Sequence, residues 1–140
     1  MILCIGYMSG NMSGITQIIK IDYDHKSIAK YIKKILPIAE ILYYDGLKLK
    51  CIGAYDTAHG KHFYFIANKE LATLEVLLIE SFLYSDLRKQ AINYIENTDI
   101  LFSNKRGVET SFNIKDINKI NRGLNKVYNK KVIYKKVVVK

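Results

Sequence analysis

The chain has 140 residues, a formal net charge of +9 and a hydrophobic fraction of 49%, which is ordinary for a globular protein. This length predicts one folded domain, residues 1–140, with a core of its own. No apolar run approaches the roughly 20 residues of a transmembrane helix, and the first residues lack the pattern of a signal peptide. The two cysteines, Cys4 and Cys51, are expected to be buried, reduced thiols of an intracellular, cytoplasmic protein.

The positive charge is concentrated near the end of the chain. Residues 1–100 contain 11 Lys or Arg against 11 Asp or Glu, whereas residues 101–140 contain 11 against 2. A basic region of this kind favours a polyanionic partner, either nucleic acid or an anionic membrane surface. A lysine-rich surface that only contacts solvent is an equally good explanation of the charge.

The first two predicted strands are Met1–Tyr7 and Ile15–Ile21. The turn-rich loop Ser9–Gly14 joins them, so they are expected to pair antiparallel. A helix follows, capped by Asp24 or Ser27. We expect it to end near Leu36, because Pro37 disrupts a helix interior.

The next two predicted strands, Ile38–Tyr44 and Leu47–Gly53, flank Asp45 and Gly46. Asp-Gly between strand-like runs is a strong hairpin signal, because a type I′ turn needs positive φ at both central residues. Apolar and mostly polar residues alternate along the second strand, so one of its faces is expected to be buried. In this alternation, Leu47, Leu49 and Cys51 alternate with Lys48, Lys50 and Ile52.

The stretch Asn68–Glu96 is predicted to be the central helix, because it lacks Gly and Pro and is rich in helix-forming residues. It follows a polar loop, Tyr55–Lys61, and a segment, His62–Ala67, whose residues favour a strand. Asn68 is the expected N-cap. An alternative is two helices that meet near Ser81–Asp86. The apolar face of this helix contains Leu71, Leu74, Leu78 and Phe82.

After this region the sequence predicts a strand at Asp99–Ser103, a turn at Asn104–Gly107, a helix capped by Asn113 and a last strand at Val132–Val139. The helix has an apolar stripe of Ile114, Ile117, Ile120, Leu124 and Val127. Its opposite side carries Lys115, Lys119, Arg122 and Lys126. The predicted fold class is therefore α/β (α+β): a single domain with a mixed β-sheet covered by helices, one of them long, central and buried.

No phosphate-binding glycine loop, nucleophile motif or metal-ligand spacing is present. His59 and His62 lie near Asp56 in the sequence, but a polar loop with a capping aspartate is the favoured interpretation. Glu75 and Glu80 are five residues apart and point in different directions on a helix. We therefore expect no catalytic residues, no metal ligands and no cofactor.

A second basic surface is predicted where the central helix turns polar, at Tyr84, Ser85, Arg88, Lys89 and Gln90. Arginine binds phosphate in a bidentate manner, and tyrosine stacks on bases. A solvated helix end is the alternative. With Lys61 and Lys69 added, the predicted nucleic-acid-binding residues are Lys61, Lys69, Arg88, Lys89, Lys115, Lys119, Arg122 and Lys126.

Residues in the range 60–100 resemble the Cgi-type small subunits of the KEOPS complex, the family of the PRPK-binding protein. The resemblance consists of Lys61-His62, Ala67-Asn68-Lys69, Ala72, Glu80, Leu83-Tyr84-Ser85, Arg88 and Gln90-Ala91-Ile92. The chain departs from the family pattern between His62 and Glu80, at Lys89 and at the Asp45-Gly46 turn. If the resemblance holds, His62–Ala67 begins a helix.

This resemblance implies a non-catalytic α/β subunit that binds a kinase-like ATPase and helps to capture tRNA during threonylcarbamoyl-adenosine synthesis. A first alternative is a longin-like subunit of a vesicle-trafficking complex, because the predicted order of strands and helices, and the region from Leu47–Cys51 to Ser85-Asp86, are similar to those of small TRAPP subunits. A second is a small nuclease that uses Asp56, His62 and Glu75.

Overall fold

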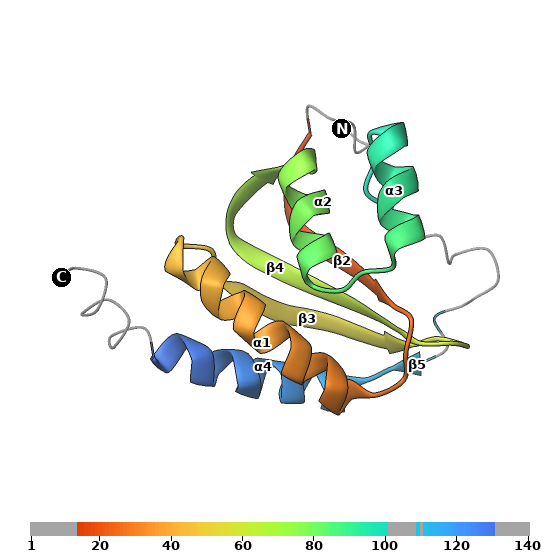
Figure 1. Ribbon diagram of the computed structural model, residues 1–140. Helices are drawn as coiled ribbons and strands as arrows, with labels where there is room; N and C mark the ends of the chain where they lie inside the picture. Colours follow the sequence, from red (N-terminus) through yellow and green to blue (C-terminus); the bar gives the residue numbers. More distant parts are fainter. Residues whose placement is uncertain (1–13, 101–108, 110, 131–140) are drawn as a thin grey trace.

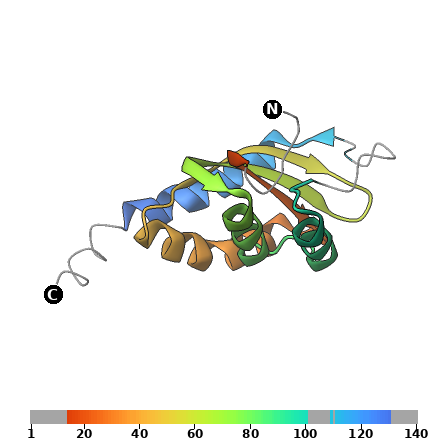
Figure 2. The same ribbon diagram turned by 90° about the horizontal axis from the view of Figure 1, so that it is seen from above.

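The computed structural model describes residues 14–100, 109 and 111–130, and its helices and strands carry the labels of Figure 1. Four strands form one sheet in the order β2-β4-β3-β5. Figure 2 shows α1, α2 and α3 on the same side of this sheet, and α4 packs against α1 and β3. The chain has a single-domain α/β fold, as predicted, with an antiparallel rather than a mixed sheet among the described strands.

The first described strand is β2 (Ile15–Tyr23), which confirms the strand predicted there. Its partner is β4 (Lys61–Ala72), with Ile19 opposite Phe65. The predicted partner strand Met1–Tyr7 lies outside the described residues. Alternate residues of β2 and β4 face the helices and form the middle of the core. These residues include Ile19, Ile21, Tyr23, Phe63, Phe65 and Ala67.

Helix α1 (Ile28–Tyr44) begins at the predicted cap Ser27, whose hydroxyl accepts a hydrogen bond from Lys30 N–H. The predicted end at Leu36 is wrong, because the helix continues through Pro37 for two more turns. An interior proline costs about 3 kcal/mol relative to alanine. The residues after the proline offset this cost, because Ala39 is buried in the core and Leu42 and Tyr43 pack against it.

The hairpin predicted around Asp45-Gly46 is therefore absent, since Ile38–Tyr44 is helical. Asp45 is instead the C-cap of α1, and Gly46 follows with a φ of 90°. Glycine adopts this left-handed conformation without strain, and it is common just after a helix. The Asp-Gly signal correctly marked a turn, but the turn joins a helix to a strand.

The hairpin of this sheet is formed by β3 (Leu49–Asp56) and β4. The predicted alternation along β3 is confirmed, with Leu49 and Cys51 buried and Lys48 and Lys50 exposed. The residues His62–Ala67 form a strand, as their propensity predicted, and not the helix start that the family resemblance implied.

The predicted central helix is shorter than Asn68–Glu96 and consists of two helices, α2 (Thr73–Phe82) and α3 (Leu87–Glu96). The alternative break near Ser81–Asp86 is confirmed, whereas Asn68 is not an N-cap, because β4 continues to Ala72. The predicted apolar face of α2 does not lie in the core. Leu74, Leu78 and Phe82 are 44%, 53% and 51% exposed.

The last described helix is α4 (Ile114–Asn129), capped by Asn113 as predicted. It runs parallel to α1 (Figure 1), and Gly123 allows a close approach, since a Cβ there would lie 3.3 Å from the Ile32 side chain. The two-residue strand β5 (Ser111–Phe112), which precedes α4, was not predicted. Asp99 and Ile100 are not in a strand, and the rest of the strand predicted at Asp99–Ser103 lies outside the described residues. The turn Asn104–Gly107 and the strand Val132–Val139 also lie outside them.

Candidate nucleic-acid interface

A row of four cations lies on the solvent side of α4. Lys115, Lys119, Arg122 and Lys126 are all exposed, as the sequence predicted. The opposite side of the helix is buried against β3 and α1, through Ile117, Ile120, Leu124 and Val127. We call these four exposed residues the α4 cationic row.

No acidic side chain within α4 opposes this row. The only acid in the helix is Asp116, which is buried and bonded to the ammonium of Lys61 at 2.7 Å. The row therefore keeps its positive charge uncompensated along the helix, and a polyanion is the complementary ligand.

Lys61, a predicted nucleic-acid contact, lies in the core and not on the surface. It is 7% exposed, and its ammonium lies 2.7 Å from a carboxylate oxygen of Asp56 and 2.7 Å from one of Asp116. Burial lowers the pKa of Lys61, but the hydrogen bonds that its ammonium donates to these two carboxylates outweigh this effect and raise the pKa overall. The surface position predicted for Lys61 is wrong, because the two carboxylates bind its ammonium inside the protein.

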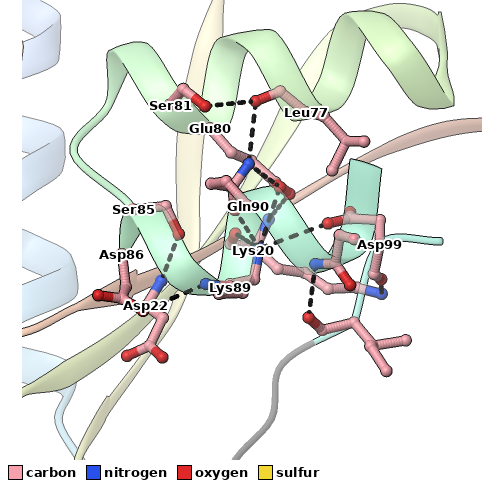
Figure 3. Close-up of polar contacts among 12 residues, drawn as sticks. Lys20, Asp22, Leu77, Glu80, Ser81, Ser85, Asp86, Lys89, Gln90 and Asp99 are labelled. Atoms are coloured by element: carbon pink, nitrogen blue, oxygen red, sulfur yellow. Dashed lines mark hydrogen bonds and ion pairs between the residues drawn. The ribbon is translucent and has the colours of Figure 1, made fainter. Parts of the chain in front are cut away.

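Lys89, also predicted as a contact, is fully buried, and Figure 3 shows the polar side chains around it. Its ammonium donates hydrogen bonds to Glu80 at 3.1 Å and to the Gln90 side chain at 2.6 Å, and it lies 3.5 Å from Asp99. One ammonium thus faces two carboxylates in the interior of the protein. Burial and the neighbouring Asp99 carboxylate hold the pKa of Glu80 well above its usual range. Lys89 cannot reach a phosphate, so its predicted surface position is wrong.

This buried cluster covers the outer edge of β2. Glu80 accepts a hydrogen bond from Lys20 N–H at 2.8 Å, and Lys89 donates one to the Lys20 carbonyl at 3.3 Å. Two residues along, the Ser85 hydroxyl accepts from Asp22 N–H. An edge strand leaves backbone groups unpaired, and within the described residues side chains of α2, α3 and their connection bond the edge of β2 where a neighbouring strand would.

The two other predicted contacts in this region, Lys69 and Arg88, are exposed. Arg88 borders a pocket of about 310 Å³ that is also lined by the carboxylates Asp22, Asp24 and Asp86. These acids make the pocket unfavourable for phosphate. With Lys61 and Lys89 buried, the second basic surface predicted here is not formed.

The first part of β3, before its short pairing with β5, is covered by uncharged side chains of α4. The Asn121 amide bonds both the N–H and the carbonyl of Cys51, at 2.8 and 2.9 Å. The Tyr128 hydroxyl does the same for Leu49, at 2.7 and 2.6 Å. These contacts fix the rotation of α4 about its axis, and so they keep the cationic row turned towards solvent.

His62 lies on the opposite face of the sheet from Lys61, and both of its ring nitrogens face carboxylates. Its Nδ1 is 2.8 Å from Glu109 and its Nε2 is 3.6 Å from Asp22. Burial lowers the pKa of His62, but hydrogen bonds with Asp22 and Glu109 outweigh it and raise the pKa. A histidine held in this way has no free ring nitrogen that could abstract a proton from a substrate.

The three residues of the nuclease alternative have separate roles in the structure. Asp56 bonds Lys61 on the core side of the sheet, whereas His62 lies on the other face. Glu75 is exposed and accepts a hydrogen bond from Ala72 N–H at the start of α2. Within the described residues, no group of three or more His, Cys, Asp or Glu side chains is arranged to hold a metal ion.

The sequence-based list missed two cations beside α4, Lys48 and Lys50. Both are exposed and, with Asn125 of α4, line a groove of about 480 Å³. The alternation of Lys48 and Lys50 with buried residues predicted their exposure. Their position next to α4 depended on the path of the chain and had no local signal.

Comparisons of the chain with family models, with curated proteins and with solved structures found no match. The resemblance to KEOPS subunits therefore stays a prediction. In the part of the chain that the structure describes, no helix is both long and apolar enough to cross a membrane.

Proposed function

We propose that this protein is a non-catalytic accessory subunit that binds tRNA through the α4 cationic row. The observation that carries the proposal is the row itself: four exposed cations on one helix, with the helix's only acid buried. From Lys115 to Lys126 the row extends over roughly 16 Å of helix. Each cation that neutralises a phosphate releases a counterion, and this release supplies affinity without base specificity.

The tRNA substrate and a kinase-like ATPase partner come from the resemblance to KEOPS subunits. A protein partner has separate support in the exposed side chains of Leu74, Leu78 and Phe82. Their spacing of four residues is that of a helix whose apolar side binds in a groove of a partner. The same three residues also favour the alternative function, a longin-like protein-interaction subunit, which would bind no RNA.

Two observations support a non-catalytic role. The only described cysteine, Cys51, is buried, and burial raises the pKa of its thiol to about 12, so it is a poor nucleophile. The described histidine closest to carboxylates, His62, has both ring nitrogens facing them.

The salt dependence of tRNA binding tests the proposal. Changing Lys119→Ala and Arg122→Ala together should flatten the slope of log K against log salt by about 1 to 2 units. The matched control is Lys30→Ala with Lys33→Ala, which removes the same charge from exposed positions of α1. Equal slopes for the two variants would show that only net charge matters and would contradict the role of α4.

The protein partner is tested separately with Leu78→Glu, which places a charge in the exposed apolar row of α2. We expect this variant to bind tRNA like the wild type and to lose co-purification with a co-expressed kinase-like ATPase of the KEOPS type. Retention of that ATPase by the variant would contradict the role of α2. Absence of any complex with the unchanged protein would favour the longin-like alternative.

A further inference from the structure

A groove lies beside the α4 cationic row, between the start of β3, the middle of β4 and the last turns of α4. Its volume is about 480 Å³, within the range of small-molecule sites. Lys48 and Lys50 line its strand side, and Asn125 and Tyr128 line its helix side. Asn125 lies three residues after Arg122 of the cationic row, and side chains three apart are neighbours on a helix, so the groove borders the row.

The groove combines an apolar floor with a polar rim. Ile66 supplies the partly exposed apolar side chain of the floor, and the core residues Leu49 and Ala67, each 2% exposed, line the groove beneath it. The Tyr128 ring lies below Lys48, with the ammonium 5.3 Å from the ring centroid. Because the Tyr128 hydroxyl bonds the Leu49 backbone, this ring is fixed in place.

The polar groups of the rim differ in whether they already have hydrogen-bond partners within the protein. Asn68 is occupied, since it accepts from Lys48 N–H and donates to the Gly46 carbonyl. Asn125 is exposed and has no hydrogen-bond partner within the described part of the chain. Its amide offers both a donor and an acceptor, and Lys48 and Lys50 add two exposed ammonium groups.

This chemistry matches an unpaired ribonucleotide better than a simple anion. A phosphate needs only the two lysines, whereas the apolar floor and the free amide fit the flat face and the polar edge of a base. Sequence-specific RNA recognition uses single-stranded bases that are splayed out in this way. We propose that the groove receives one unpaired nucleotide of the bound RNA, its base over the floor and beside Asn125, its phosphates near Lys48 and Lys50.

This inference rests on the proposed function and adds a preference for single-stranded RNA, which the α4 cationic row alone would not provide. The test compares an unpaired oligoribonucleotide with a fully paired RNA duplex of equal length. Asn125→Ala should weaken binding of the unpaired strand about fivefold, the value of one hydrogen bond, and leave the duplex unchanged. Lys119→Ala with Arg122→Ala should weaken both.

A second measurement uses the wild-type protein and small probes. Uridine 5′-monophosphate and adenosine 5′-monophosphate should shift the side-chain amide signals of Asn125 in an NMR titration, and ribose 5-phosphate should not. Equal shifts with ribose 5-phosphate would show that the groove binds only the phosphate and would overturn the proposal. Unchanged single-strand affinity in Asn125→Ala would also overturn it, even if the α4 variant behaves as proposed. If the α4 variant binds both RNAs normally, the proposed function itself fails.

Discussion

Two strand edges without a neighbouring strand in the described sheet are covered in different ways: the outer edge of β2, and the part of β3 that precedes its pairing with β5. Along β2, the backbone groups of Lys20 bond the ionisable side chains of Glu80 and Lys89. Along β3, the backbone groups of Cys51 and Leu49 bond the uncharged side chains of Asn121 and Tyr128. Both arrangements satisfy an unpaired strand edge, but only the first places an ammonium group in the interior.

The difference shows why net charge is a poor guide to a binding surface. Covering β2 uses Lys89, so this cation is absent from the surface. Covering β3 uses only an amide and a phenol, so all four cations of α4 remain exposed. A lysine therefore contributes to a nucleic-acid surface only if the fold does not need its charge elsewhere.

The largest loss of stability is expected from Lys89→Met, which removes the ammonium group at the β2 edge. This change keeps the volume but leaves the buried Glu80 and Asp99 carboxylates without their ammonium. Removing one partner of a buried ion pair costs about 3–5 kcal/mol. Urea unfolding should show this loss, whereas the control Arg88→Met, at the exposed neighbouring position, should stay within about 0.5 kcal/mol. Equal stability of the two variants would mean that the β2 edge does not depend on the ammonium.

Removing the side chain that covers the β3 edge should lower the free energy of unfolding by less. Asn121→Ala removes two hydrogen bonds and leaves the N–H and carbonyl of Cys51 without partners. An unsatisfied buried group costs about 1–3 kcal/mol, but both bonds are only part-buried, so water replaces some of what is lost. We therefore expect a total loss of about 1–3 kcal/mol for the two groups in the same urea measurement. Asn125→Ala, one turn further along α4, is the matched control and should change stability little. A loss as large as that of Lys89→Met would contradict the difference between the edges.

The pH dependence of stability should separate the two edges further. A carboxyl group whose pKa is raised on folding stabilises the fold at a pH below its unfolded pKa, and this contribution is lost as the pH rises through the folded pKa. The raised pKa of Glu80 therefore predicts that the wild type loses stability, relative to Glu80→Gln, as the pH rises above the ordinary carboxyl pKa of about 4. Urea unfolding at a series of pH values measures this difference. Stability curves of the two proteins that stay parallel over this range would contradict it.

The sequence predicted those elements whose local signals agree with the final packing. β2 and α4 are examples: a β-branched run marks the first, and a cap with an amphipathic stripe marks the second. α1 was predicted too short, because the packing of Ala39, Leu42 and Tyr43 outweighs the local cost of Pro37. Local propensity is overruled wherever burial contributes more free energy.

The candidate site was predictable only in part for a similar reason. The spacing of the cations on α4 indicated one exposed face, and their exposure is confirmed. The spacing around Lys89 also indicated an exposed helix end, but Glu80, nine residues earlier, draws its ammonium inside. Such a pairing depends on how α2 folds back against α3, which no local pattern records.

The most direct test of the whole account measures stability and tRNA affinity on one variant, with Lys115, Lys119, Arg122 and Lys126 all changed to Gln. Because these side chains are exposed and cover no strand edge, the unfolding free energy should stay within about 1 kcal/mol of the wild type. The affinity for tRNA in about 0.1 M salt should fall by at least about 100-fold. Unchanged affinity in this folded variant would mean that the α4 cationic row only contacts solvent, and it would contradict the proposed function.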